Sequence, residues 1–414
     1  MSSFFNLLLS SKDEPRHIWY GGTIYPCVLD QNTPQKIEQA YLLIQGQKIE
    51  AVGSMTEEIF ATYLADETIE KHNFENQHLC AGLIDLHVHL GLYPEGFVGE
   101  PKDLNELTNP ITPQLRAMDG IWPRDIAFEK ARNAGITTVC VLPGSANVIG
   151  GTGVVLKTVG IDVEEMVLLE PACLKVAFGY NVKHNYGSKG KTPLTRMAIA
   201  DLFRQSFEQA LRYEEQKLLK PDTPIDRGKE AILMAIRQEI PVRAHASRVD
   251  DILTAMRLAK EFGLKLVIEH GYEAKWIVDK LKAQNVSVAY GPAFRTCGHS
   301  EDLHFDFADA QILLDAGITV AQMTDHPIVP VQYLNLQAGL CIREGVDPYQ
   351  ALNMITAFPA KILNCESRVG SLKKGLDADF VIYQHFPLSI EAKVQATYIQ
   401  GNCVYSLDSS IKKN

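Results

Sequence analysis

The segment AGLIDLHVHLG, residues 81–91, joins a short apolar run to two histidines that stand two positions apart. Alternate residues of a β-strand point to the same face, so the imidazoles of His87 and His89 can reach a single ion. Three further apolar runs end in a side chain that can bind a metal ion: PVRAH at His245, LVIEH at His270 and VAQMTD at Asp325. Neutral imidazole and carboxylate are natural ligands of zinc-like ions. A lone histidine at a strand end is more often a core residue, but the whole set predicts a metal site.

A repeated alternation of helical and apolar segments predicts the fold around these residues. Five times a helical pattern ends at a turn-like residue and a run rich in Val, Ile and Leu follows, in residues 129–144, 237–247, 259–271, 281–292 and 313–327. Such alternation is typical of parallel strands covered by helices. Residues 80–360 have room for an α/β fold of the (β/α)8 type, a TIM-like barrel, which takes about 250 residues. Active sites of such barrels lie where the strands end, so the candidate ligands should meet at one face.

The segments on either side of the barrel, residues 1–79 and 361–414, have a different pattern. HIWYGGTIYPCVLD near the start and ATYIQGNCVYSL near the end are typical of short β-strands joined by turns. We therefore expect a small β-sandwich domain built from both termini.

Composition and charge narrow the range of partners. The chain has 414 residues with 40 Lys+Arg against 50 Asp+Glu, a net charge of −10 at pH 7. No basic excess is available to neutralise phosphates, which argues against nucleic acid or an anionic membrane as the main partner and favours a small-molecule substrate. Eight cysteines without a C-x-x-C pair favour a reducing, cytoplasmic location. The apolar run at residues 4–9 is short and has no basic flank before it, so we expect no signal peptide.

At these residues the chain resembles the amidohydrolase superfamily of metal-dependent hydrolases. The matching parts are residues 81–91, the three later ligand candidates, and VGSLKKGLDADFVIY at residues 369–383. Ala81 is a departure, since the family usually has Pro before that Gly. Within the superfamily, SANVIGGTGVVLKTVG (residues 145–160) and LKVAFGYNVKHNYG (residues 174–187) are similar to the imidazolonepropionase-related group, in a subgroup of largely unassigned activity. Oligomers are common among such relatives, so a homo-oligomer is a candidate assembly.

The resemblance implies hydrolysis of a C–N bond in an amide or cyclic amide. A metal-activated hydroxide would attack, with Asp325 as the proton carrier and His270 also in the catalytic set. Zinc is the expected metal, with one or two ions per chain. In many members a lysine reacts with CO₂, and its carbamate bridges two metals. Lys175 is the better candidate for that carboxylated lysine, and Lys157 is its rival because it too ends an apolar run.

Two alternatives remain open. In a mononuclear deaminase-like hydrolase, one metal would bind His87, His89, His245 and Asp325, while His270 polarises the substrate. A non-catalytic oligomeric scaffold is the second alternative, but such drift is expected to lose ligand residues, and all candidates are present here.

Further polar residues follow the predicted strands and are candidates for substrate binding. They are Lys157, Tyr180, Asn181, Arg248 and Arg295. An arginine at a barrel mouth can hold a substrate carboxylate with two hydrogen bonds. The polar stretch at residues 96–114 is long for a loop between strand and helix, and we expect it to act as a lid.

Overall fold

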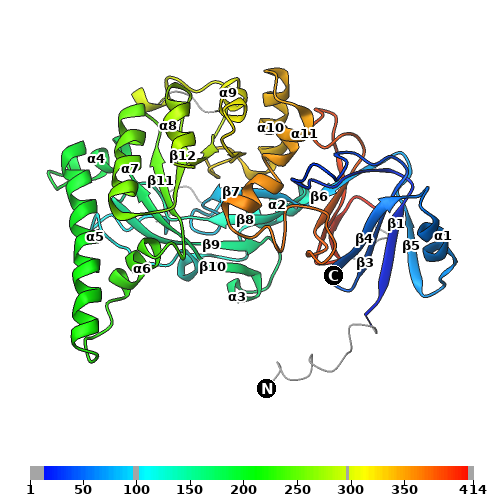
Figure 1. Cartoon of the computed structure of the whole chain (residues 1–414), viewed down its shortest axis with the longest axis horizontal. Coiled ribbons are helices and arrows are strands. Elements are labelled where there is room, and N and C mark those ends of the chain that lie inside the picture. Colours follow the sequence, from blue (N-terminus) through cyan, green and yellow to red (C-terminus); the bar gives the residue numbers. More distant parts are fainter. Residues whose placement is uncertain (1–13, 97–101, 295–297, 409–414) are drawn as a thin grey trace.

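A computed structural model describes residues 14–96, 102–294 and 298–408. The N-terminal run at residues 4–9 and the side chain of Arg295 lie outside the described residues. Within the described ranges the strands form three sheets of four, eight and five strands. Figure 1 shows the eight-stranded sheet with most of the helices at one side and the two smaller sheets at the other.

The eight-stranded sheet curls into a nearly closed barrel, which confirms the predicted fold class. Its strands, in sheet order from one edge to the other, run from β14 back to β7. They are β7 (Leu83–Val88), β8 (Ile136–Val141), β9 (Ile149–Lys157), β10 (Val167–Ala177), β11 (Val242–Ala246), β12 (Leu266–His270), β13 (Ser287–Tyr290) and β14 (Val320–Gln322). The first and last strands meet through a parallel bridge between Val88 and His326. Backbone hydrogen bonds from Asp325 N to His87 O and from His89 N to His326 O, both 3.0 Å long, lie beside this bridge.

One strand runs against the others, and this differs from the expected barrel. No helix separates β8 from β9, and β9 pairs antiparallel with both β8 and β10. The register places Lys157 opposite Thr138 near the start of β8, and Gly151 opposite Lys175 near the end of β10. The carboxyl end of β9 therefore lies at the end of the barrel where the parallel strands begin.

Helices cover the outside of the barrel, apart from α1, which packs on the four-stranded sheet, and some of the helices carry the expected start and stop signals. The α-helices are α1 (Glu58–Ala65), α2 (Ile126–Asn133), α3 (Val163–Met166), α4 (Tyr180–Gly187), α5 (Arg196–Leu219), α6 (Arg227–Ile236), α7 (Val249–Phe262), α8 (Val278–Ala283), α9 (Asp309–Asp315), α10 (Leu334–Arg343), α11 (Pro348–Asn353) and α12 (Ala357–Ile362). Short 3₁₀ turns are η1 (Ala117–Gly120), η2 (Ala274–Ile277), η3 (Ser300–Asp302) and η4 (Val331–Tyr333). The Thr195 side chain caps α5 by accepting from Ala198 N, and α7 ends at Gly263, whose φ of +67° suits glycine.

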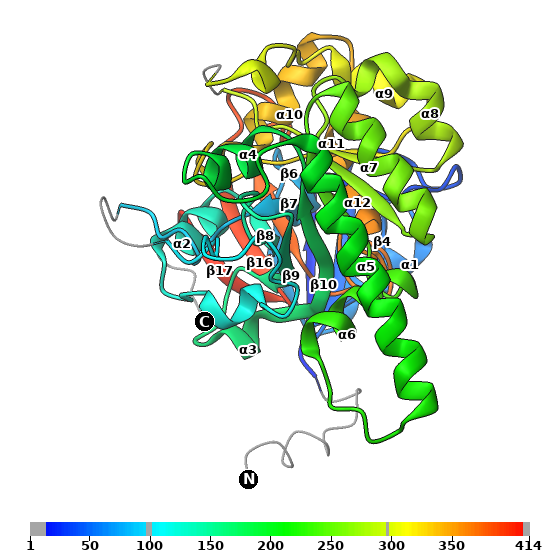
Figure 2. The same cartoon turned by 90° about the vertical axis from the view of Figure 1, so that its left-hand side faces the viewer.

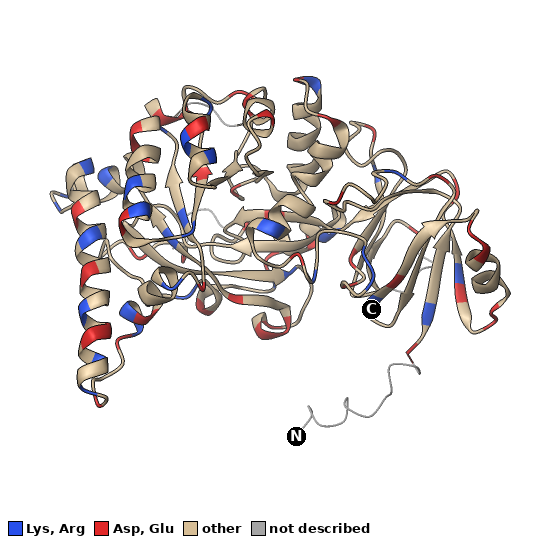
Figure 3. Cartoon of the chain, in the orientation of Figure 1, with Lys and Arg blue, Asp and Glu red and all other residues tan. Residues whose placement is uncertain are grey.

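The long helix α5 shows how the helices bury one face. Ile199, Phe203 and Phe207 recur every four residues and are buried where α5 packs against α6 and α7, while the other face reaches water. Figure 2 views this side of the molecule, with α5 running across the front of the strands. Figure 3 shows acidic and basic residues interspersed along the same helix. No helix in the described ranges is both long and apolar enough to cross a bilayer.

Of the two smaller sheets, the five-stranded one combines strands from both ends of the chain, and the four-stranded one contains strands from the N-terminal part only. The four-stranded sheet has the order β4-β3-β1-β5, and the five-stranded sheet has the order β17-β16-β15-β6-β2. Their strands are β1 (Arg16–Tyr20), β2 (Thr23–Tyr25), β3 (Ala40–Gln45), β4 (Lys48–Ser54), β5 (Ile69–Asn73), β6 (His78–Ala81), β15 (Phe380–Tyr383), β16 (Val394–Ile399) and β17 (Asn402–Ser406). Trp19 packs edge-on against Phe380 and Tyr398, at 4.8 and 5.1 Å between ring centres, and so links the two sheets. The division into domains at residues 79/80 and 360/361 stays a prediction.

Candidate metal centre and active-site pocket

The six predicted ligand side chains come from five strands that are parallel to one another. His87 lies in β7 and His89 directly follows it, while Asp325 follows β14. Lys175, His245 and His270 lie at or near the ends of β10, β11 and β12, which are neighbours in the sheet. The backbone at both His270 and Asp325 has a positive φ, +72° and +52°. Such strained conformations in non-glycine residues cluster at functional sites.

His87, His89 and Asp325 form a buried trio. Asp325 Oδ1 lies 3.3 Å from His87 Nε2 and 3.1 Å from His89 Nε2. On the other side of each ring, His87 Nδ1 lies 2.6 Å from Glu269 Oε2, and His89 Nδ1 donates to the Leu142 carbonyl at 2.8 Å. Those acceptors hold the ring protons on Nδ1, so each neutral ring turns the lone pair of Nε2 toward the carboxylate.

This arrangement fits a cation. A lone pair and a carboxylate oxygen that face each other at about 3 Å need a positive charge between them, either a proton or a metal ion. Burial lowers the pKa of His87 well below its usual range, and the positive charge of Lys175 adds to that effect, so protonation of this ring is unfavourable. Imidazole nitrogens and a carboxylate oxygen are also the donor set that zinc-like ions prefer.

A second pair of imidazoles lies beside the trio. The ring centres of His245 and His270 are 4.3 Å apart, and those of His87 and His270 are 5.6 Å apart. His270 Nδ1 donates to the Gly291 carbonyl at 2.8 Å, and its Nε2 is buried with no hydrogen-bond partner among the described residues. An unpaired buried polar atom is costly. A bound ion or substrate atom would relieve that cost.

Lys175 completes the set from β10. It is fully buried, and its Nζ lies 3.3 Å from His87 Nε2. Burial lowers the pKa of the Lys175 amine, although the carboxylates of Glu269 and Asp325 act in the opposite direction. The trio, the imidazole pair and this amine therefore share one end of the barrel.

Asp325 is held in its charged form. Burial alone would raise the pKa of this carboxyl, but the His89 contact and the charges of the neighbouring imidazoles lower it below its usual range. A carboxylate that stays ionised can bind a cation and can receive a proton.

The buried charged residues that lie behind the candidate ligand side chains were not predicted from the sequence. Arg243 and Glu269 are fully buried and form an ion pair, with Arg243 Nη2 lying 3.0 Å from Glu269 Oε2. Arg243 also donates to the Leu86 carbonyl at 3.0 Å. This pairing could have been inferred from the sequence. Two apolar runs each contain one charged residue, and a charged residue that is buried is almost never left unpaired. PVRAH and LVIEH each carry one, and they are of opposite sign.

Asp85 belongs to the same buried group. It accepts a hydrogen bond of 2.5 Å from Thr324 Oγ1 and a longer one, of 3.3 Å, from the backbone of His87. Burial raises the pKa of Asp85 to about 7, against the opposing effect of these hydrogen bonds. Asp85 thereby ties the segment before Asp325 to the strand that carries His87 and His89.

A cavity of about 250 Å³ opens onto the ligand side chains. It is lined by His89, Tyr93, Leu104, Asn105, Gly144, Ser145, Ala146, Asn181, Asn185, His245, His270, His299, Asp325, Pro327 and Ile328. Leu104 and Asn105 come from the segment predicted to be a lid, whose residues 97–101 lie outside the described ones. Asn181 lines the cavity and its Nδ2 lies 3.4 Å from His245 Nε2.

Three of the other predicted substrate-binding residues, Tyr180, Arg248 and Lys157, do not line this cavity. Tyr180 is partly exposed and stacks against His299 without lining the cavity. Arg248 pairs with the adjacent Asp250 at 2.9 Å.

Lys157 was expected at the barrel mouth and is not there. It is buried in an ion pair with Asp377 and Asp379, in the segment that leads into β15. The prediction was wrong because β9 runs antiparallel, which carries the end of this apolar run to the opposite end of the barrel.

Comparisons with known proteins agree with this fold. The family model described as the amidohydrolase family matches residues 78–404. The crystal structure of an amidohydrolase from Thermotoga maritima MSB8 is 37% identical with a TM-score of 0.88, over 94% of this chain and all of that one. The amidohydrolase tasK of Hapsidospora irregularis is 28% identical over an alignment 375 residues long, and the match covers 81% of this chain. The chain spans only 37% of the length of that relative. Guanine deaminase of E. coli shares the fold, with a TM-score of 0.57, 14% identity and coverage of 95% of this chain and all of that one.

Proposed function

Because this chain belongs to the amidohydrolase family, we propose that it is a metal-dependent hydrolase that cleaves the C–N bond of an amide or cyclic amide. The observation that carries the proposal is the meeting of four histidines, a lysine and an aspartate beside one cavity at the end of the barrel. Zinc is the proposed metal, since imidazole and carboxylate are its usual ligands.

The chain's own residues would divide the work as follows. His87, His89, His245, His270 and Asp325 would hold the metal, one ion or two. A bound divalent ion lowers the pKa of water to about 7 and polarises a carbonyl. Asp325 lines the cavity as a carboxylate, so it can take the proton of the attacking water and pass it to the leaving nitrogen.

A carboxylated Lys175 is the further part of the proposal. Addition of CO₂ to the neutral amine gives a carbamate and one proton, and it turns a donor into a carboxylate-like ligand. Two observations support Lys175: its Nζ lies 3.3 Å from His87 Nε2, and burial favours the neutral amine. The surroundings of Lys157 speak against it as the rival, because its Nζ is paired with Asp377 and Asp379.

A mononuclear deaminase-like site is the second candidate. The ligand atoms of His87, His89 and Asp325 all lie within 4.8 Å of one another, so this trio could hold one ion without help from Lys175. His270 would then be left to polarise the substrate from the cavity wall.

Metal counting separates the two candidates. If Lys175 is carboxylated and bridges two ions, the barrel site should bind two equivalents of Zn²⁺, and a Lys175→Met variant should bind at least one equivalent fewer than the wild-type chain. Lys183→Met, on helix α4, is a matched control that should bind as the wild type does. Equal zinc counts in the wild type and in Lys175→Met would favour the mononuclear site instead.

The cavity lining supports a neutral, amide-rich substrate. Among the described residues that line it, none is lysine or arginine, and Asn105, Asn181 and Asn185 offer amide groups that both donate and accept. Paired N–H and C=O groups of a cyclic amide would suit these side chains. This is consistent with a place in the imidazolonepropionase-related group, which the motifs at residues 145–160 and 174–187 favour.

The test is a substrate screen with metal-loaded, full-length protein. Hydantoins, lactams and imidazolones should be compared with N-acyl amino acids and dipeptides, with metal content measured in every sample. Turnover of a cyclic amide that chelation abolishes and added Zn²⁺ restores would support the proposal. Turnover that survives complete removal of metal would contradict it.

A further inference from the structure

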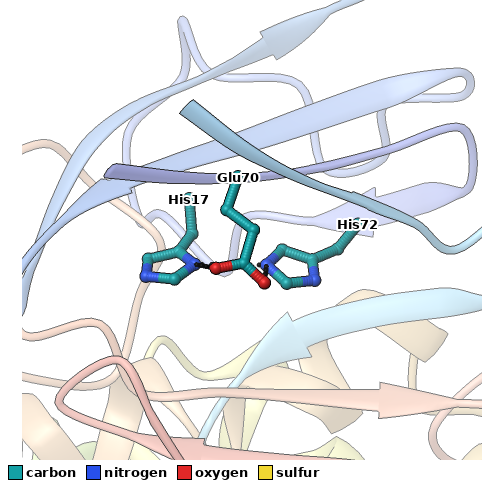
Figure 4. Close-up of side chains that lie close together, drawn as sticks. All are labelled: His17, Glu70 and His72. Atoms are coloured by element: carbon teal, nitrogen blue, oxygen red, sulfur yellow. Dashed lines mark hydrogen bonds and ion pairs between the residues drawn. The ribbon is translucent and has the colours of Figure 1, made fainter. Parts of the chain in front are cut away.

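A second cluster of metal-ligating side chains lies outside the barrel, on the four-stranded sheet. His17 comes from β1, and Glu70 and His72 come from β5, which pairs with β1 in parallel. The register sets His17 opposite Glu70, and Glu70 and His72 stand two positions apart on one strand. Alternate residues share a face of a sheet, so the backbone alone brings all three side chains together. Figure 4 shows the carboxylate of Glu70 lying between the two imidazole rings.

The nitrogens of the two histidines and the two oxygens of Glu70 are spaced closely enough to surround one ion. His17 Nδ1 lies 3.2 Å from His72 Nε2 and 3.3 Å from one oxygen of Glu70. The other oxygen of Glu70 lies 3.7 Å from His72 Nε2. Ligand atoms placed 2.0–2.2 Å from zinc at tetrahedral angles lie about 3.3–3.6 Å from one another. The observed separations therefore leave room for one ion of that size without movement of the backbone.

The rings are also held in position by their surroundings. His72 stacks on Trp19 with 4.5 Å between ring centres and an interplanar angle of 17°. Trp19 is buried and is itself fixed by Phe380 and Tyr398 of the five-stranded sheet. An imidazole whose orientation is set by packing loses less freedom when it binds an ion.

We propose that His17, Glu70 and His72 form a site for a divalent transition-metal ion of the zinc class, distinct from the barrel site, which clamps edge strand β5 to β1. Two imidazoles and one carboxylate suit zinc, nickel or copper better than magnesium or calcium, which prefer oxygen ligands. Glu70 is 65% exposed, so water can reach the ion and fill the remaining coordination position.

A hydrogen-bonded cluster without metal is the competing explanation. A hydrogen bond in which one of the nitrogens His17 Nδ1 and His72 Nε2 donates and the other accepts would satisfy both, and Glu70 would then face a neutral pair. That explanation predicts no change when metal is added, whereas one divalent ion satisfies all three groups at once. The two explanations therefore differ in measurable stoichiometry.

The experiment counts zinc on the full chain in equilibrium dialysis against a range of Zn²⁺ concentrations. The double variant His17→Ala/His72→Ala should bind one equivalent fewer than the wild type. His385→Ala removes an exposed histidine just after β15 and serves as the matched control, which should keep the wild-type count. Equal counts in the wild type and the double variant would overturn the proposal, whatever the barrel binds.

A second variant guards against a folding defect in the first. Glu70→Gln changes only an exposed carboxylate and keeps both imidazoles, so the last equivalent of zinc should still bind, with its midpoint shifted to higher Zn²⁺ concentration. Zinc added in this range should raise the melting temperature of the wild type and of His385→Ala, because a ligand that binds only the folded chain stabilises it. A Glu70→Gln binding curve that superimposes on that of the wild type would also overturn the proposal.

Discussion

The two histidine clusters of this molecule use the same residue types in different surroundings. In the barrel, His87 and His89 are buried, and each Nδ1 has a fixed partner on Glu269 or Leu142. Asp325 then faces both Nε2 atoms. Each Nδ1 is therefore paired within the protein, and each Nε2 faces the carboxylate of Asp325, where a cation would fit.

On the four-stranded sheet the two imidazoles are only partly buried, and they are positioned in a different way. His17 and His72 keep about a quarter to a third of their side-chain surface exposed, at 25% and 30%, and His72 is positioned by stacking on Trp19. The difference teaches that burial makes a supporting layer necessary, since a buried imidazole cannot leave a nitrogen to water. We therefore expect the barrel cluster to bind metal more tightly than the sheet cluster.

The largest expected effect comes from the carboxylate of the barrel cluster. Asp325→Asn keeps the shape of the side chain but removes the negative charge and the ability to carry a proton. Turnover should fall by about 10²-fold or more, and the circular dichroism spectrum should be unchanged. Metal content must be measured on the same sample, because the variant also loses a ligand.

Asp250→Asn is the control for Asp325→Asn. Asp250 pairs with Arg248 on the exposed surface, so its loss should leave kcat near the wild-type value. Metal-loaded Asp325→Asn protein with a kcat within a few-fold of wild type would refute the role of Asp325 as proton carrier.

The supporting layer of the barrel gives the next largest effect. Glu269→Gln leaves the buried Arg243 without its counter-charge, which should lower the free energy of unfolding by about 3–5 kcal/mol. The double change Arg243→Met/Glu269→Leu replaces the whole ion pair with apolar groups and should recover most of that loss. Urea denaturation measures both.

The same double variant isolates the role of Glu269 as the positioning residue for His87. His87 Nδ1 would have lost its acceptor, so metal affinity should fall by about 10–100-fold even though the fold is stable. Competition with a chromophoric chelator gives that affinity. A stable double variant with wild-type metal affinity would mean that the supporting layer serves stability alone.

A smaller effect is expected from the cavity wall. Asn181→Ala removes an amide that lies 3.4 Å from His245 and lines the cavity, so kcat/KM should fall by about tenfold, which corresponds to one hydrogen bond. Steady-state kinetics on a substrate found by the screen measures this. If kcat/KM does not change, substrate does not reach this wall.

The smallest effect is expected for Arg248. This side chain was predicted to bind substrate, but it pairs with Asp250 outside the cavity. Arg248→Gln should change the free energy of unfolding by no more than about 0.5 kcal/mol and should leave KM as in the wild type. A rise in KM would show that the surface around Arg248 takes part in binding after all.

Much of the barrel and its ligand set was predictable because the relevant signals are local. An apolar run, a helical stripe such as that of α5 and a histidine at the end of a strand are each visible within about fifteen residues. The carboxyl ends of parallel barrel strands all lie at one face of the barrel. His87, His245 and Asp325 could therefore be expected to meet without a structure. The same reasoning failed for Lys157, because an apolar run looks alike whether its strand is parallel or antiparallel.

The residue types and their spacing thus determined by themselves that this chain folds into an α/β barrel with imidazoles and a carboxylate at the strand ends. Only the tertiary structure decided three other matters: the reversed direction of β9, the pairing of Arg243 with Glu269, and the meeting of His17 with a histidine 55 residues further along the chain. The physical reason is the same for all three. Strand direction and register are set by hydrogen bonds and packing between distant segments, and the periodicity of one segment carries no record of the partner that will lie beside it.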